Sequence, residues 1–192
     1  MSNTTNSSWQ YRQTNNSTSL STDYTLTATS RDTVINTKTY KVYTNSNGNT
    51  LDYYSISGND YYNFRALGAA LGNLKVENLY LKDNLAVSST WTQSLNITVP
   101  GAPFPIPITL TYTIAEKGST RTVNSITYTD VIKVTTAISS SAIPSASLVT
   151  DIQDFYARKF GAIESNYKLS LNFMGVVQNT DTKTILLSAD IK

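Results

Sequence analysis

The chain has 192 residues, of which 40% are hydrophobic and 15% are charged, and its formal net charge is +2. This length suits one domain with a sizeable core, and so small a net charge argues against nucleic acid as a partner. Neither cysteine nor histidine occurs, which excludes disulfides and thiol catalysis and removes the commonest general base and transition-metal ligand.

The N-terminal segment is polar and of low complexity. We predict that residues 1–7 are a flexible tail and that residues 8–192 are a single β-rich domain. The tail lacks the basic and apolar regions of an export signal. Two interpretations stay open from the residues alone: a cytoplasmic protein with an irregular start, or an exported protein whose signal has been removed.

The first half of the chain predicts strands. Thr and Tyr dominate its alternating segments, and both suit a pleated, half-buried surface. A long strand is expected from Leu20 to Ser30, interrupted at Arg31-Asp32. A three-stranded meander should follow over residues 39–65, with its tightest turn at Asn47-Gly48, because both residues tolerate positive φ.

The middle of the chain predicts strands over 76–81 and 91–99, preceded by a short helical turn over residues 67–72. Residues 100–107 are rich in proline, and proline donates no backbone hydrogen bond, so a central strand is excluded there. We expect an extended, exposed loop carrying Phe104 and Ile106, acting as a stiff connection rather than a recognition motif.

The second half is again strand-rich. A strand over 108–116 should turn back at Lys117-Gly118-Ser119, and a two-residue turn is expected at Asn124-Ser125. A buried strand over 131–135 should precede a loop over 139–149 with a short helix toward Asp151. The remaining predicted strands are Phe155–Lys159, Ile163–Leu171 and 185–191.

Three segments carry a family resemblance: Leu79–Thr92 with Thr-Trp at its end, Thr122–Val134 with Val-Asn-x-x-x-Tyr-x-x-Val-Ile, and Phe155–Glu164 with Tyr-Ala-x-x-x-Gly-x-Ile. In this order they resemble a family of uncharacterised Bacteroidetes cell-envelope lipoproteins. The resemblance covers roughly residues 76–192. The chain departs from the family at Ser88 and Ser125, where the family has Gly, and at Lys159-Phe160, where it has Gly-Val.

The resemblance implies a lipoprotein exported to the cell envelope, periplasmic or surface-exposed, and acylated on a Cys that this sequence lacks. It also implies a mainly β fold: a curved antiparallel sheet or open barrel, similar to lipoprotein carriers, with one or two short helical segments. Such a sheet could hold an apolar or amphipathic ligand, such as a lipid, in its concave face. We expect a monomer that contacts a membrane only through its lipid anchor and binds no nucleic acid.

Three groups of residues could in principle carry catalysis or bind a metal. Ser139–Ser141 has no base nearby, and a serine-rich loop is favoured over a nucleophile. Asp151 and Asp154 would share one face of a helical turn, where caps or surface charges are favoured over an acid–base pair. The loop with Asn179 and Asp181 has too few oxygen ligands for Ca²⁺.

We therefore predict no catalytic, metal or cofactor residues, and no enzyme. The leading hypothesis is an envelope-anchored domain that binds an apolar or amphipathic ligand. The alternative is a carbohydrate-contacting or protein-interaction domain that uses exposed Tyr and Trp. Two structural predictions complete the set: Arg158 pairs with Glu164 on the surface, and Gly161 marks a constrained backbone position.

Overall fold

The computed structural model describes residues 4–66, 75–98 and 104–192, and most of these residues lie in strands. The strands are β1 (Ser8–Asn15), β2 (Ser21–Ile35), β3 (Lys38–Asn45), β4 (Thr50–Ser57), β5 (Asp60–Ala66), β6 (Lys75–Lys82), β7 (Thr90–Ile97), β8 (Ile106–Val123), β9 (Ile126–Ser139), β10 (Leu148–Ala157), β11 (Gly161–Phe173) and β12 (Val176–Asp190). One short 3-10 helix, η2 (Ser145–Ser147), follows β9. The predicted helical turn over 67–72 lies outside the described residues.

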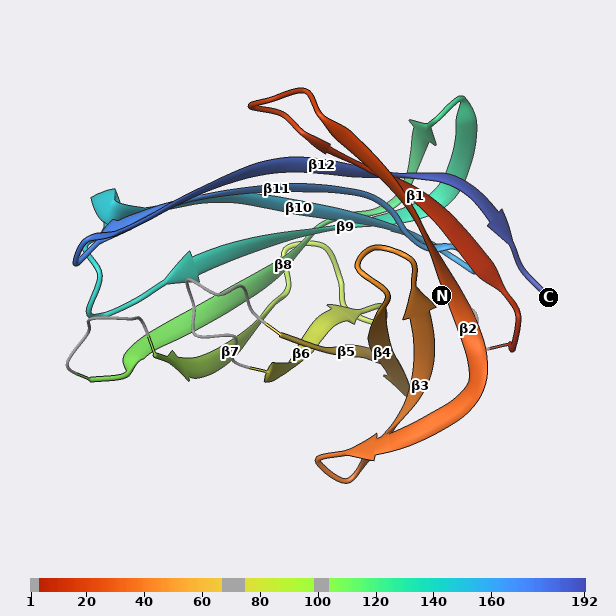
Figure 1. Cartoon of the computed structure of the whole chain (residues 1–192), viewed down its shortest axis with the longest axis horizontal. Helices are drawn as coiled ribbons and strands as arrows, with labels where there is room; N and C mark the ends of the chain where they lie inside the picture. Colours follow the sequence, from red (N-terminus) through yellow and green to blue (C-terminus); the bar gives the residue numbers. More distant parts are fainter. Residues whose placement is uncertain (1–3, 67–74, 99–103) are drawn as a thin grey trace.

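The strands form one 12-stranded sheet in the order β6-β5-β4-β3-β2-β1-β12-β11-β10-β9-β8-β7, and every pairing is antiparallel. The first and last strands of the chain pair in the middle of this order. The two edge strands, β6 and β7, are consecutive in the chain. The sheet curls until these edges approach each other, so that it is nearly closed into a barrel with a seam (Figure 1). The mainly β prediction is confirmed.

Two predicted breaks are bulges within continuous strands. At Arg31-Asp32 the strand does not end, because β2 runs on to Ile35 with a register shift between Ala28 and Asp32. The predicted turn at Lys117-Gly118-Ser119 is also wrong, because β8 continues to Val123 through three register shifts. Bulges bend and twist a strand without reversing it, and these bulges are where the long strands bend.

The predicted turn at Asn124-Ser125 is confirmed, and both residues have positive φ, 49° and 64°. The β3–β4 connection differs in detail from its prediction. Its positive-φ residues are Gly48 and Asn49, in a loop of four residues between Asn45 and Thr50. The meander over β3, β4 and β5 is as predicted.

The proline-rich segment was predicted to be an exposed loop, and the prediction is wrong at Ile106. Residues 100–103 of this segment lie outside the described residues. Phe104 is exposed as expected, but Ile106 begins β8, pairs with Ile97 and is fully buried. Pro107 is tolerated on the same strand because β8 begins to pair with β9 only at Thr109.

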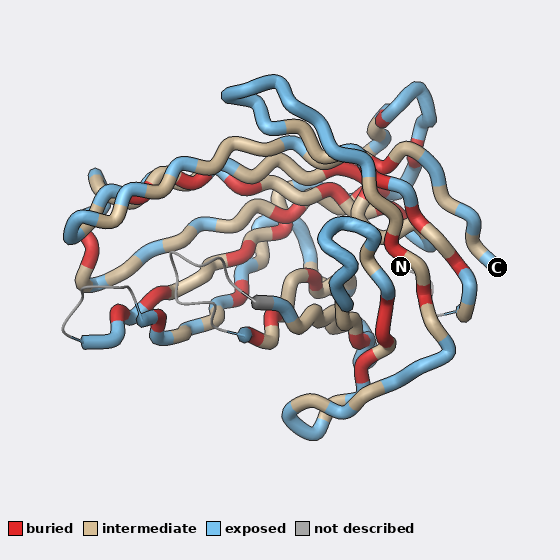
Figure 2. The backbone as a smooth tube through the Cα atoms, viewed as in Figure 1, coloured by how far each residue is buried: buried red, intermediate tan, exposed pale blue. Residues whose placement is uncertain are grey.

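The distal part of the β8–β9 hairpin folds onto the outer face of the sheet. There the guanidinium carbon of Arg121 lies 3.5 Å from the centre of the buried Phe155 ring. Near the hairpin tip, the Asn124 side chain donates a hydrogen bond of 3.0 Å to the carbonyl of Leu187 on β12. Outside such contacts the exposed residues gather at the hairpin ends (Figure 2). The sheet is therefore covered on part of its outer face as well as packed inside.

Part of the segment predicted as a flexible tail contacts the sheet. The backbone N–H of Asn6 donates to the carbonyl of Ala28 at 2.8 Å. Ser7 is fully buried, and its hydroxyl accepts a hydrogen bond from the backbone N–H of Lys192. Residues 1–3 lie outside the described residues. Within the described ranges, no helix is long and apolar enough to cross a membrane.

Candidate ligand cavity

The curled sheet encloses a cavity of about 550 Å³. Eleven of the strands, all except β3, contribute side chains to its wall. This volume lies within the range of about 300–1,000 Å³ that small-molecule sites occupy. The wall divides into an aliphatic part and a polar part, and the two parts differ sharply in chemistry.

The aliphatic part is built by inward-facing positions of β7, β8, β9 and β11. Its residues include Leu95, Ile97, Ile108, Leu110, Ile138 and Leu169. Period-two alternation places these side chains on one face of each strand. Ile143, from the connection that leads to η2, also lines the cavity and packs against Ile97 and Leu169 in one cluster. This part can bury an apolar chain, and its aliphatic side chains have no group that could hydrogen-bond to a polar one.

The polar part is rich in tyrosine. Tyr54, Tyr80, Tyr156 and Tyr167 line it, and their hydroxyls make no hydrogen bond with the residues that the structure describes. Burial raises the pKa of each of these four hydroxyls above its ordinary value of 10.0. The phenols are therefore neutral near pH 7 and available as donors and acceptors.

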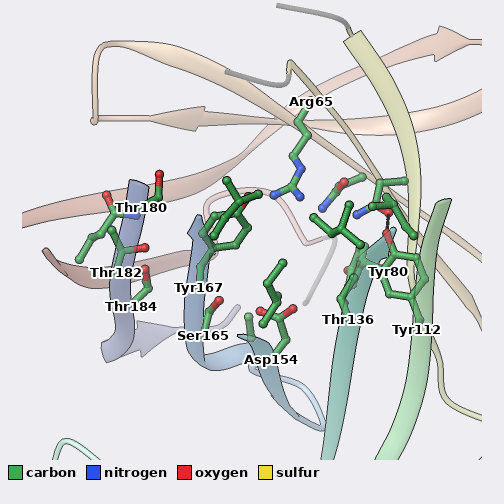
Figure 3. Close-up of a pocket in the computed structure, with 18 of the residues that line it drawn as sticks. Arg65, Tyr80, Tyr112, Thr136, Asp154, Ser165, Tyr167, Thr180, Thr182 and Thr184 are labelled. Carbon is green, nitrogen blue, oxygen red and sulfur yellow. Dashed lines mark hydrogen bonds between the residues drawn. The ribbon is translucent and has the colours of Figure 1, made fainter. Parts of the chain in front are cut away.

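Two charged residues, Arg65 and Asp154, face the same space. Arg65 comes from β5 and Asp154 from β10, and Figure 3 shows them reaching into the cavity from opposite sides of the view. No salt bridge joins them or pairs either one with another described residue. Burial raises the pKa of Asp154, against the opposing effects of hydrogen bonding to Ser165 and of the Arg65 charge.

The seam beside the cavity is held by side chains instead of a backbone ladder. The indole N–H of Trp91 on β7 donates to the carbonyl of Leu79 on β6 at 2.8 Å. The Gln93 amide spans the same gap, donating to the carbonyl of Glu77 and accepting from the N–H of Leu79. The Tyr112 hydroxyl donates to the side chain of Asn78, a buried residue of β6. These bonds satisfy polar groups of an edge strand that has no strand partner there.

The structure separates the two aspartates that the sequence placed together. Residues 148–157 form strand β10, not a helical turn, so positions 151 and 154 have opposite facing. Asp151 is exposed and bonded to Gln153, whereas Asp154 lines the cavity. The prediction of one shared face is therefore wrong, because it assumed the 3.6-residue period of a helix and the segment has the two-residue period of a strand.

The serine-rich loop and the Asn179–Asp181 loop have ordinary hydrogen-bond and ionic partners. Ser140 accepts a hydrogen bond from the backbone N–H of Ala142. Asp181 lies 3.7 Å from the Lys168 ammonium and accepts from Asn16, and the side-chain oxygen of Asn179 accepts from the hydroxyl of Ser170. Among the described residues, no group of three or more acidic side chains could hold a metal ion.

The predicted ion pair between Arg158 and Glu164 is wrong, because Glu164 pairs with other cations. Arg158 is exposed, whereas the Glu164 carboxylate is 4% exposed on the outer face, 2.8 Å from Arg121 and 3.1 Å from Lys183. Burial acts to raise its pKa, but hydrogen bonds and charge from Arg121 and Lys183 outweigh burial and lower the pKa to about 2. This carboxylate attaches the folded-over hairpin to the sheet.

Sequence reasoning missed Arg65 and Asn63 as cavity residues. Both lie on β5 and face inward with Tyr61, at period-two spacing that is visible in the sequence. A strand face made of Tyr, Asn and Arg is equally typical of a face exposed to solvent, so the pattern does not indicate a cavity. Only curling of the sheet makes that face an interior wall.

Comparison with known proteins shows a likeness of fold. No protein-family model and no curated protein matches the chain. A solved structure of a candidate lipoprotein from Parabacteroides distasonis aligns at 10% identity with a TM-score of 0.51, over 98% of this chain and 96% of that chain. A candidate exported protein from Bacteroides fragilis, with a YmcC-like fold, aligns at 10% identity with a TM-score of 0.46, over 97% and 96%. The first of these is similar to this chain in fold along nearly its whole length.

Proposed function

We propose that this chain is a non-enzymatic module of the cell envelope that holds one amphipathic molecule inside its curled sheet. The observation that carries the proposal is the divided wall of one cavity, with aliphatic side chains in one part and unpartnered hydroxyls and charges in the other. An apolar chain would be buried against Leu110, Ile138 and Leu169. Its polar group would lie among the tyrosines and Arg65.

The envelope location in this proposal has two supports. The three motif segments resemble Bacteroidetes envelope lipoproteins, and a solved structure of similar fold belongs to a candidate lipoprotein of Parabacteroides distasonis. Export and lipid anchoring of this chain are part of the proposal. Their test is the protein's location in fractionated cells, where recovery with cytoplasmic proteins would contradict them.

A surface that binds carbohydrate has less support from the structure. Such sites stack sugars on exposed aromatic faces. Here Trp9 is fully buried and Trp91 is 9% exposed, and all 13 tyrosines are buried or half-buried. Both tryptophans are thus buried and several tyrosines line the cavity, where they suit an enclosed ligand better than a surface glycan.

The test uses 1-alkanols of increasing length, which displace the neutral apolar dye N-phenyl-1-naphthylamine from the purified protein. Burying a methylene contributes about 0.8 kcal/mol, so each added carbon should tighten binding about fourfold until the aliphatic part is full. Dye binding that is absent, or affinity that does not grow with chain length, would contradict the proposal.

Neighbouring positions on β12 provide a matched pair of variants. Thr180 lines the cavity, and Asn179 faces outward and is exposed. Thr180→Phe should shorten the longest alkanol accepted, because the ring occupies cavity volume, and Asn179→Phe should leave the series unchanged. An equal response of both variants would place the bound alkanol elsewhere.

A further inference from the structure

The cavity contains one positive and one negative side chain. Among the residues that line it, Arg65 and Asp154 alone are charged. Elsewhere in the described chain, cations and carboxylates on adjacent strands come into contact, as in Lys82–Asp60 at 2.8 Å between β6 and β5. Arg65 and Asp154 come from opposite arms of the sheet, and the empty volume lies between them (Figure 3).

Leaving the enclosed Asp154 carboxylate without a cation in contact is unfavourable, because burial has removed part of its hydration. Arg65 makes no hydrogen bond or ion pair with a described residue, and Asp154 interacts only with the Ser165 hydroxyl and with distant charges. Asp52 is the other carboxylate near Arg65, but it is bonded to Asn45. A ligand with both charges would satisfy both groups at once.

The side of the cavity that holds Asp154 suits an ammonium group. Besides burial, the charge of Asp154 raises the pKa of the Tyr80 and Tyr156 hydroxyls, so both side chains lie near this carboxylate. The rings of Tyr80 and Tyr156 lie 5.5 Å apart in the same wall. An ammonium donates hydrogen bonds and is attracted to aromatic faces, so the carboxylate and the two tyrosine rings together form a cation site.

Arg65 suits the other charge of such a ligand. A guanidinium is planar, positively charged and matched in geometry to the two oxygens of a carboxylate or phosphate. Arg65 is also exposed to solvent, in contrast to the half-buried Asp154. The anionic group would therefore lie nearer the solvent than the ammonium.

We propose that the cavity selects an amphiphile with a zwitterionic polar group, whose primary ammonium binds Asp154 beside Tyr80 and Tyr156 and whose phosphate or carboxylate binds Arg65. This inference rests on the proposed function, since it assigns the polar part of the same ligand. It concerns selection among amphiphiles, which can fail while amphiphile binding holds.

The experiment measures displacement of N-phenyl-1-naphthylamine by probes with one dodecyl chain and different polar groups. The zwitterions are dodecyl phosphoethanolamine and 2-aminotetradecanoic acid, each with one dodecyl chain and a primary ammonium. The single-charge and neutral probes are dodecyl phosphate, dodecylamine and 1-dodecanol. At least one zwitterion should bind tenfold or more tightly than every other probe. The preferred zwitterion then identifies phosphate or carboxylate as the group bound by Arg65.

Two variants assign the preference to its residues. Asp154→Asn should abolish the advantage of the zwitterion over dodecyl phosphate, and Arg65→Gln should abolish its advantage over dodecylamine. The matched controls are Asp151→Asn, on the outer face of the same strand, and Arg158→Gln, which is exposed. Both controls should keep the wild-type preference, and circular dichroism should show all four variants folded.

The outcomes separate the two proposals. Equal affinity for all dodecyl probes, or strongest binding of dodecyl phosphate or dodecylamine, would overturn the zwitterion assignment and leave the proposed function standing. A preference that survives both Asp154→Asn and Arg65→Gln would also overturn it. Failure of every probe to bind would overturn the proposed function itself.

Discussion

Two carboxylates on the β10–β11 hairpin have opposite surroundings. Glu164 is on the outer face, opposite Phe155, and both Arg121 and Lys183 contact it. Asp154 is on the inner face, opposite Ser165, and no cation among the described residues contacts it. The surroundings lower the pKa of Glu164 to about 2 and raise that of Asp154.

The difference distinguishes Glu164, whose charge stabilises the fold, from Asp154, whose charge is available to a ligand. Around Glu164 the fold supplies every partner, so the carboxylate stabilises the attachment of the β8–β9 hairpin and can bind little else. Around Asp154 the fold supplies a hydroxyl and leaves an open volume. A buried group that the protein does not satisfy is a candidate for a ligand, and the predictions below test that distinction.

The largest expected effect is at the outer carboxylate. Glu164→Gln should lower the free energy of unfolding by about 3 kcal/mol, because it leaves Arg121 and Lys183 without their anion. Urea unfolding measures this loss. Asp181→Asn, which breaks the more exposed contact with Lys168 at 3.7 Å, should cost less than about 0.5 kcal/mol. Similar losses in the two variants would refute the structural role of Glu164.

Low pH should weaken the ion pairs that Glu164 forms with Arg121 and Lys183. The pKa of Glu164 is lowered in the folded state from an ordinary value of 4.5 to about 2. Its contribution is therefore complete above pH 4.5 and is lost as the pH falls toward 2, by about 3 kcal/mol in all. Urea unfolding at several pH values should show the gap between wild type and Glu164→Gln closing over this range. A gap that is constant with pH would contradict the assignment.

The turn between the two strands should show an intermediate effect. Gly161 has φ of 75°, which L residues with branched side chains rarely adopt. Gly161→Val should lower the free energy of unfolding by about 2 kcal/mol. Lys159 has φ of 70° in the same turn, and Lys159→Gly should have no effect or stabilise slightly. Unchanged thermal melting of Gly161→Val would mean that the backbone there is free to adjust.

The smallest expected effect on stability is at the inner carboxylate. Because burial raises the pKa of Asp154, ionising this carboxylate costs more free energy in the folded protein than in the unfolded chain. Asp154→Asn should therefore change the free energy of unfolding by less than about 1 kcal/mol, toward greater stability. The gain should shrink as the pH falls and the aspartate takes up a proton. A large loss would show that Asp154 has a structural partner after all.

Secondary structure was predictable from the sequence where hydrophobic and polar residues alternate with a period of two along a whole segment. Alternation predicted most of the strands, and the Asn-Ser and Gly-centred turns agree with the backbone angles found at Asn124-Ser125 and Gly161. The misses share a cause. Arg31-Asp32 and Lys117-Gly118-Ser119 look like breaks, but neighbouring strands on both sides maintain the pairing and turn a break into a bulge.

The cavity residues could not be found in this way. The choice of face for Asn63 and Arg65, and the separation of Asp151 from Asp154, depend on how the whole sheet curls. Alternation shows that two faces exist, but it does not show which face is enclosed. Glu164 found its partner Arg121 across 43 residues of chain, a pairing that no local pattern contains.

By itself, the sequence determined that this protein is a β-sheet protein without cysteine or histidine chemistry, because composition and period-two alternation act within each segment. Only the tertiary structure decided that the two edge strands meet at a seam, that a cavity lies inside, and that Arg65 and Asp154 share it. The physical reason is that curvature, closure and charge pairing depend on contacts between strands far apart in the chain. Those contacts leave Glu164 satisfied on the outside and Asp154 open to a ligand within.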